Sequence, residues 1–95
     1  MLYTYFAKGG EVKMALFLGV HKISAGMQES EIVEGYNKYK ESARAKGLNP
    51  LSAVFSLEKG FAHCQTEAQS ADQVREAHTA VEIPLEDVVE VKPIT

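Results

Sequence analysis

Hydrophobic and polar side chains alternate with period two between residues 14 and 23, which is the spacing of a β-strand. Both alternating sets contain apolar residues, so this strand is predicted to be central and covered on both faces. Residues 28–46 instead carry apolar side chains at helical spacing, with acidic residues early and basic residues late, as the helix dipole favours. Gly47 ends this predicted helix.

The second half of the chain continues with a hairpin, a helix and a strand. Residues 51–57 and 61–67 are predicted to be the two strands of the hairpin. Ser70 and Gln73 form a capping-box pattern at the start of a second helix, and residues 87–94 are a last, valine-rich strand. The order βαββαβ predicts an α+β, ferredoxin-like fold: a four-stranded antiparallel sheet with two helices on one face.

Residues 1–13 precede this repeat, so we expect an N-terminal extension followed by one ferredoxin-like domain over residues 14–95. A strand over residues 2–7 that turns at Gly9 and Gly10 would add a hairpin edge to the sheet. Residues 1–13 are therefore interpreted as peripheral to the fold, with an extra strand as their predicted structure.

The composition is that of one folded domain: 95 residues, of which 45% are apolar and 24% charged. A net charge of -3 and the lack of a long Lys or Arg run argue against nucleic acid or an anionic membrane as partners. The longest apolar stretch, residues 14–20, is too short to cross a bilayer, and no signal-peptide pattern opens the chain. We therefore expect a cytoplasmic protein.

The candidate chemistry lies in the second half of the chain, where a strand with Cys64 leads into a helix with His78. A single cysteine makes no internal disulfide, so Cys64 is a buried apolar residue, a reactive thiol or a metal ligand. His78 shares a helical face with Val74 and Ala77 and therefore points toward the core. A thiolate and an imidazole suit nickel, copper or zinc, although a hydrogen-bonded core histidine is an equally simple interpretation of His78.

Several short motifs run along the chain from residue 14 onward: Val20-His21-Lys22 followed by Gly26, Cys64 three residues before Glu67-Ala68, Ser70, Arg75-Glu76-Ala77-His78, Pro84 and the strand over residues 86–91. With these motifs the chain resembles the small nickel-binding ferredoxin-like protein family, formerly a domain family of unknown function. The resemblance implies a homodimer and a divalent transition metal, Ni²⁺, with His21, Cys64 and His78 as the metal ligands. His63 is a reserve ligand in this hypothesis.

One position departs from the family pattern. Many relatives carry a histidine one helical turn after the region that matches Ile32, and this chain has Tyr36 there. A neutral tyrosine, with a pKa of about 10, is a poor ligand for a divalent ion unless the metal lowers that pKa.

The strand over residues 14–23 leaves the direction of His21 open. If its more hydrophobic, aliphatic set faces the helices, His21 points to the open face of the sheet. That face would then offer a second cluster of donors for zinc or nickel, namely His21, His63 and Glu90. A bulge near Gly19 would instead turn His21 toward the helices.

Helices on one side only leave the other sheet face uncovered, with Phe17, Val54, Phe61 and Val88 expected on it. An apolar patch of this kind is typical of an association surface. We therefore expect a homodimer of the dimeric α/β barrel type, whose two sheets meet across a two-fold axis and enclose a cavity.

Three functions fit these features. The first is a nonenzymatic metal-binding protein, with nickel as the metal, for sequestration, delivery or sensing. The second is a small dimeric α/β barrel enzyme of the cofactor-free oxygenase or isomerase type, which would use His21 or His63 as a general base on a small molecule. The third is a purely structural interaction module, which would have neither a pocket nor metal affinity.

Overall fold

The computed structural model describes the backbone of residues 2–7 and 10–94, and the side chains of residues 13–94. Strands and helices follow one another in the order β1 (Leu2–Ala7), β2 (Gly10–Lys22), α1 (Glu29–Ala45), β3 (Asn49–Ser56), β4 (Phe61–Ala68), α2 (Ala71–Thr79) and β5 (Asp87–Val91). Each predicted strand and helix is thus present, with ends that differ by a few residues. Within the described residues, neither helix combines the length and hydropathy that a membrane span requires.

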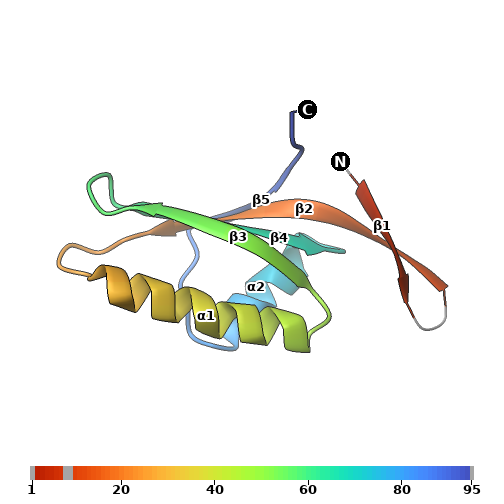
Figure 1. Cartoon of the computed structure of the whole chain (residues 1–95), viewed down its shortest axis with the longest axis horizontal. Helices are drawn as coiled ribbons and strands as arrows, with labels where there is room; N and C mark the ends of the chain where they lie inside the picture. The colour runs from red at the N-terminus through yellow and green to blue at the C-terminus, as the bar shows by residue number, and fades with distance from the viewer. Residues whose placement is uncertain (1, 8–9, 95) are drawn as a thin grey trace.

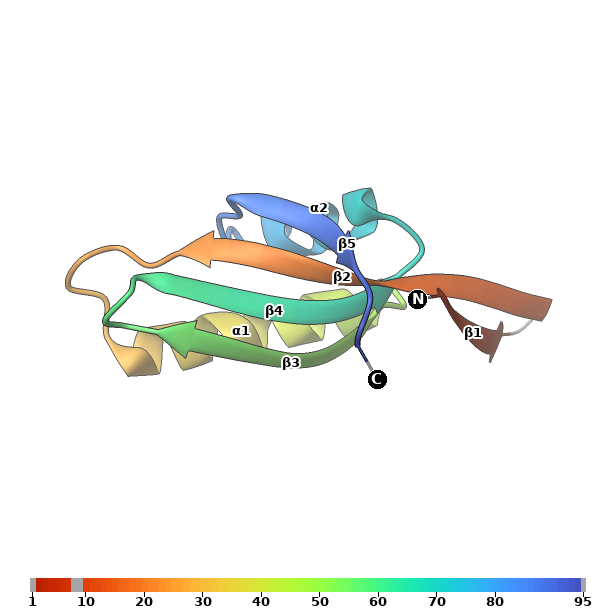
Figure 2. The ribbon, with the colours of Figure 1, turned by 90° about the horizontal axis from the view of Figure 1, so that it is seen from above.

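Strands β2 to β5 form an antiparallel sheet in the spatial order β5-β2-β4-β3. Figure 2 shows these four strands side by side, and Figure 1 shows both helices beneath the same face of the sheet. Neither α1 nor α2 lies on the opposite face. This arrangement confirms the predicted ferredoxin-like fold, and the dimeric association stays a prediction.

The first strand, β1, pairs antiparallel with the N-terminal half of β2, from Leu2 opposite Ala15 to Ala7 opposite Gly10. The N-terminal half of β2 projects beyond the end of the four-stranded sheet, and β1 pairs with this projecting part (Figure 1). Gly9, at the predicted turn, lies outside the described residues.

Capping hydrogen bonds form at the start of each helix, and that of α2 involves the predicted residues Ser70 and Gln73. The backbone N–H of Gln28 donates to the Glu31 carboxylate at the start of α1, and the Ser70 hydroxyl accepts from the backbone N–H of Gln73 at the start of α2. These bonds satisfy donors that the first helical turn leaves unpaired. After α1, Gly47 adopts a φ of 79°, a left-handed conformation that glycine allows without steric cost.

The core lies between the sheet and the two helices. It consists of Ala15, Phe17, Tyr39, Ala43, Leu48, Cys64, Ala68, Val74, Ala77 and Val88. Because Phe17 and Val88 are only 6% and 5% exposed, the prediction that they lie on the open face is wrong. Val54, by contrast, is 62% exposed.

The orientation of β2 is the opposite of the one in which its aliphatic residues face the helices. A Cβ atom on Gly19 would meet the Cys64 sulfur at 2.6 Å and His78 at 3.6 Å, so Gly19 faces α2. His21, two residues on, faces the same way, while Leu18 and Val20 face the open side. The β2–β4 register runs without a break from Ala15 to Lys22, so no bulge is needed. Hydrophobicity does not predict this orientation, because the sulfur of Cys64 and the imidazole of His78 fill the space on the helix side of Gly19.

Glycine substitutions test this packing. Gly19→Ala is expected to lower the free energy of unfolding by about 1 to 3 kcal/mol, because the added methyl group collides with the Cys64 sulfur. Gly35→Ala is the matched control: it lies inside α1 with nothing within 4 Å of the added atom, and is expected to raise the free energy by about 0.5 to 1 kcal/mol. Urea unfolding of the metal-free protein measures both. An unchanged stability in Gly19→Ala would contradict the close contact.

Candidate metal centre

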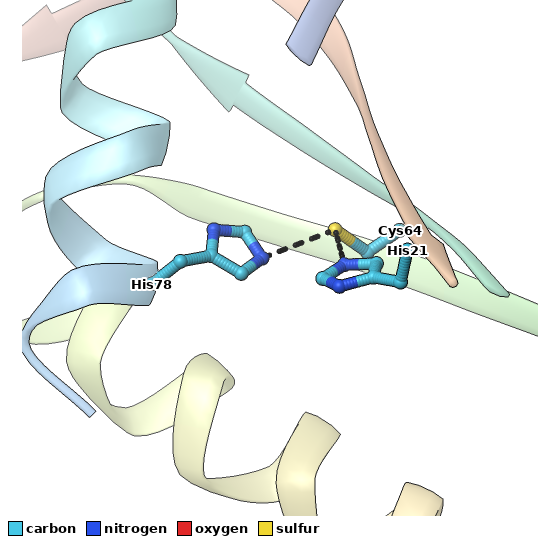
Figure 3. Close-up of side chains that lie close together, drawn as sticks. All are labelled: His21, Cys64 and His78. Carbon is cyan, nitrogen blue, oxygen red and sulfur yellow. Dashed lines mark hydrogen bonds between the residues drawn. The ribbon is translucent and has the colours of Figure 1, made fainter. Parts of the chain in front are cut away.

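Three side chains from three different elements converge beneath the sheet. His21 comes from the end of β2, Cys64 from the middle of β4 and His78 from the last turn of α2, and Figure 3 shows them pointing toward one another. The Cys64 Sγ atom lies 3.5 Å from His21 Nε2 and 3.6 Å from His78 Nε2. The three possible ligand atoms all lie within 4.8 Å of one another. Residues that are 14 to 57 positions apart in the sequence thus form one cluster.

His78 is held rigidly on the buried face of α2. Its side chain is 1% exposed, and its ring stacks on Tyr39 of α1 at a centroid distance of 3.9 Å. Its Nδ1 atom lies 2.7 Å from the carbonyl oxygen of Val74, one turn earlier in the helix. Stacking and hydrogen bonding together fix the direction in which Nε2 points.

His21 is oriented by the loop between α2 and β5. Its Nδ1 atom lies 2.9 Å from the carbonyl oxygen of Pro84. That loop is held in turn by two backbone bonds, from Ile83 N–H to the His78 carbonyl (3.0 Å) and from Glu86 N–H to the Val20 carbonyl (2.8 Å). The loop therefore ties the end of α2 to the end of β2 and brings Pro84 to His21.

The hydrogen bonds determine the tautomers of both rings. A carbonyl oxygen only accepts, so Nδ1 of His21 and Nδ1 of His78 each carry the proton. In a neutral imidazole the other nitrogen, Nε2, is then an acceptor with its lone pair directed outward. Two acceptors therefore face one Cys64 thiol, which has one proton to donate.

Burial keeps all three groups neutral in the metal-free protein. Desolvation lowers the pKa of His78 to about 4, against the opposing effect of its Val74 bond, with a smaller lowering from nearby His21. The pKa of His21 is lowered by burial, against the raising effect of the Pro84 bond. Burial also raises the pKa of the Cys64 thiol to about 11. Both imidazoles are thus available as neutral ligands at pH 7, whereas the thiol must lose a proton to bind a metal.

The sulfur–nitrogen distances match those around a tetrahedral ion. Metal–sulfur bonds of about 2.3 Å and metal–nitrogen bonds of about 2.0 Å at a tetrahedral angle place the two donors about 3.5 Å apart. The distances to Cys64 Sγ are 3.5 and 3.6 Å. These three residues could therefore hold a metal ion, and backbone carbonyls like those of Val74 and Pro84 commonly orient ligating histidines.

The second predicted cluster does not form. His63 pairs with Val20 in the sheet and its ring contacts Phe61 at 4.9 Å, so it faces the side opposite Cys64. Glu90 is opposite Phe17 in the β2–β5 pairing. Across residues 13–94, the group with metal-binding spacing is His21, Cys64 and His78. His21 and His63 point to opposite faces because they are separated by one position in the register.

Two features of the centre were missed by the sequence reasoning. Gly19 lies directly opposite Cys64 in the β2–β4 pairing and leaves room for the sulfur. A glycine inside a hydrophobic strand signals a close approach and could have indicated this. The other feature is the identity of the carbonyl that orients His21: a backbone acceptor such as that of Pro84 has no residue-type signal.

A cavity of about 390 Å³ extends from the centre along the space between the sheet and α1. His21, Cys64 and His78 are among its lining residues, and Cys64 and His78 are the deeply buried ones, at 3% and 1% exposed. Met27, Val33 and Phe55 also line it and are 39%, 47% and 37% exposed, so the cavity opens to solvent there. The cavity gives an ion a path from the surface to the three donors.

Tyr36 of α1 lies in the wall of this cavity. Burial raises the pKa of its phenol, and the nearby Cys64 thiol raises it further. The hydroxyl oxygen is buried and has no hydrogen-bond partner within the described part of the chain. A tyrosine thus occupies the cavity wall where the resemblance implies a histidine.

Comparison with known proteins supports the fold. The structure is similar to the crystal structure of SCO4226 from Streptomyces coelicolor A3(2), with a TM-score of 0.77 and 18% sequence identity over 85% of this chain and 100% of that chain. At this identity the similarity shows a shared ferredoxin-like fold. No protein-family model and no curated protein matches the sequence.

The lowered pKa of His78 predicts an acid-sensitive fold. Its contribution to stability is fully present above pH 6.5 and is lost as the pH falls toward about 4, because the unfolded imidazole takes up a proton that the folded one refuses. His21 acts in the same direction. In metal-free protein, the unfolding free energy should fall by up to about 1.4 kcal/mol per pH unit for each such group.

Urea unfolding between pH 6.5 and 5, with a chelator present, measures this slope. His78→Gln is expected to flatten it, because glutamine does not titrate. Gly35→Ala, which changes no titratable group, should keep the original slope. Equal slopes in all three proteins would contradict the assignment to His78.

Proposed function

We propose that this protein is a small, nonenzymatic metal-binding protein that holds one late first-row transition ion, Ni²⁺ in this proposal, for sequestration, delivery or sensing. The ligands are His21 Nε2, Cys64 Sγ and His78 Nε2. The observation that carries the proposal is the convergence of two outward lone pairs and one thiol at sulfur–nitrogen distances of 3.5 and 3.6 Å. These distances match those of a tetrahedral site.

A hydrogen-bonded cluster accounts for the same residues less well. The single thiol proton satisfies one Nε2 acceptor at a time, so the other buried acceptor is left without a donor among these three groups. A metal ion takes the place of that proton and bonds to all three atoms. One thiol proton for two Nε2 acceptors therefore favours a bound metal ion over a hydrogen-bonded cluster.

The donor set narrows the metal to those that accept both sulfur and imidazole. Thiolate and imidazole bind nickel, copper and zinc, whereas calcium and magnesium prefer oxygen ligands. Nickel is proposed because of the motifs shared with the nickel-binding family, including Cys64 and His78. Competition between Ni²⁺, Zn²⁺ and Cu²⁺ for the purified protein ranks the three directly.

The enzyme alternative draws less support from the site. A general base needs a free nitrogen near its substrate, but His21 directs Nδ1 to Pro84 and Nε2 to Cys64. His63 does face the open side of the sheet, where this enzyme would need its base. The cavity, however, is lined mainly by residues of the helix side, whereas the dimeric-barrel enzyme needs a pocket on the open face.

We further propose that the protein is a homodimer joined through the open face of the sheet. The supporting observation is a row of half-buried or exposed apolar side chains on that face: Leu18, Val20, Val54, Phe61 and Val89. Both α1 and α2 lie on the other face of the sheet and leave these side chains uncovered. A second copy would remove these side chains from water, in keeping with the dimers of the family that the sequence resembles.

Metal binding is tested on tag-free, metal-free protein titrated with Ni²⁺, with bound metal measured per chain. We expect one ion per chain at micromolar metal. Cys64→Ala and His78→Ala should each weaken binding by more than the roughly 10- to 100-fold that follows loss of an outer hydrogen-bond partner. Both act directly on a ligand atom.

His63→Ala is the matched control and should bind as the original protein does. Circular dichroism of each variant shows whether it is folded. Absence of Ni²⁺, Zn²⁺ and Cu²⁺ binding by the folded, unaltered protein would end the proposal. Unchanged affinity in a folded Cys64→Ala, His78→Ala double variant would move the site elsewhere.

Val54→Lys tests the dimer. Val54 is 62% exposed at the open face, so a lysine there is expected to shift the protein to monomers by placing a charge in the apolar contact. Val33→Lys makes the same change at a 47% exposed valine on α1 and should leave the dimer intact. Sedimentation velocity gives the mass of each. A monomeric unaltered protein at tens of micromolar would refute the homodimer.

A further inference from the structure

The cavity above the metal centre is much larger than an ion requires. Its volume of about 390 Å³ falls within the range of about 300 to 1,000 Å³ that small-molecule pockets occupy. It begins at the three proposed ligands and ends among solvent-exposed side chains of α1 and β3. A small molecule can therefore enter from the surface and reach the metal.

Most of the cavity wall is apolar. Its lining includes Met27, Ile32, Val33, Ala53, Phe55 and Ile83. The charged residues that touch it, Lys22, Glu31 and Glu82, are exposed. A molecule in the cavity therefore needs an apolar body, with its polar atoms at the inner end.

A metal ion held by His21, Cys64 and His78 would favour a negatively charged group beside it in the cavity. Three protein ligands leave one position of a tetrahedral ion free. A divalent ion with the Cys64 thiolate and two neutral imidazoles retains one positive charge, and a buried, uncompensated charge is unfavourable. A ligand with a single negative charge at the free position neutralises the centre.

The Tyr36 hydroxyl supplies the remaining partner. It is a buried donor with no hydrogen-bond partner within residues 13–94, and it lines the same cavity as Cys64. Tyr39, by contrast, is engaged with Thr66. Buried hydroxyls without a partner are rare, and such a group at a ligand cavity indicates a bond made when the cavity is filled.

We propose that the cavity binds a small monoanion with an apolar body, of the medium-chain carboxylate class, whose carboxylate takes the free position on the metal and accepts a hydrogen bond from Tyr36. The proposal rests on the proposed metal site. The proposal gives a role to Tyr36, which stands where the family that the sequence resembles carries a histidine. Tyr36 positions an external ligand and does not itself bind the ion.

The experiment uses the full chain loaded with Co²⁺, whose visible absorption reports the number and type of its ligands. Hexanoate is the probe; acetate provides the charge without the apolar body, and 1-hexanol provides the body without the charge. We expect hexanoate to change the Co²⁺ spectrum at much lower concentration than acetate, and 1-hexanol to leave it unchanged.

Two variants separate the role of the cavity from that of the metal ligands. Tyr36→Phe should keep its Co²⁺ affinity and bind hexanoate about tenfold or more weakly, because a bond to a charged acceptor is lost. Gly35→Leu should keep Co²⁺ affinity and lose the hexanoate response, because Gly35 lines the cavity with no atom near its Cβ position. Gly35→Ala is its smaller control and should retain the response.

Each outcome has one meaning. Failure of the unaltered protein to take up Co²⁺ or Ni²⁺ overturns the metal site, and this inference with it. Metal uptake with no hexanoate response, or a response equal to that of acetate, overturns the inference alone. Unchanged hexanoate affinity in Tyr36→Phe also overturns it, as does loss of metal affinity in that variant, which would make the phenol a metal ligand.

Discussion

The site depends on one constraint: each histidine donates its Nδ1 proton to a backbone carbonyl. Val74 supplies the acceptor for His78 and Pro84 the acceptor for His21. Because these bonds consume the single proton of each neutral ring, both Nε2 lone pairs are left facing the Cys64 sulfur. The acceptors belong to the main chain of α2 and of the following loop, so the fold itself sets the tautomers. A side-chain acceptor would be less rigid.

Packing brings the sulfur into reach of both rings. Gly19 has no Cβ, and the space that a side chain would fill is taken by Cys64 and His78. The stacking of Tyr39 on His78 then closes the site on the side of α1. The same close packing removes water, which lowers the pKa of the imidazoles and raises that of the thiol. Geometry and protonation state therefore have a common origin in the packing around Gly19.

The order of strands and helices was predictable because period-two spacing, helical spacing and capping residues such as Ser70 act over a few residues. The facing of β2 was not, since both its residue sets are apolar and Leu18 is more hydrophobic than Gly19. The long-range pairing of Gly19 with Cys64 decides it. Sequence therefore identified His21, Cys64 and His78 as candidates, whereas their convergence depends on register and on the path of the loop at Pro84.

Desolvation of Cys64 also sets the reactivity of its thiol in the metal-free protein. A thiol with a pKa of about 11 is almost wholly protonated at pH 7, and the thiolate is the form that attacks electrophiles and is oxidised. The thiol of the metal-free protein is thus poorly reactive at neutral pH. A divalent ion changes this, because its charge compensates the thiolate in the buried space and the two fixed imidazoles bind without losing a proton. In the proposed function, metal binding is therefore coupled to release of one proton from Cys64, which makes the affinity rise with pH through the neutral range.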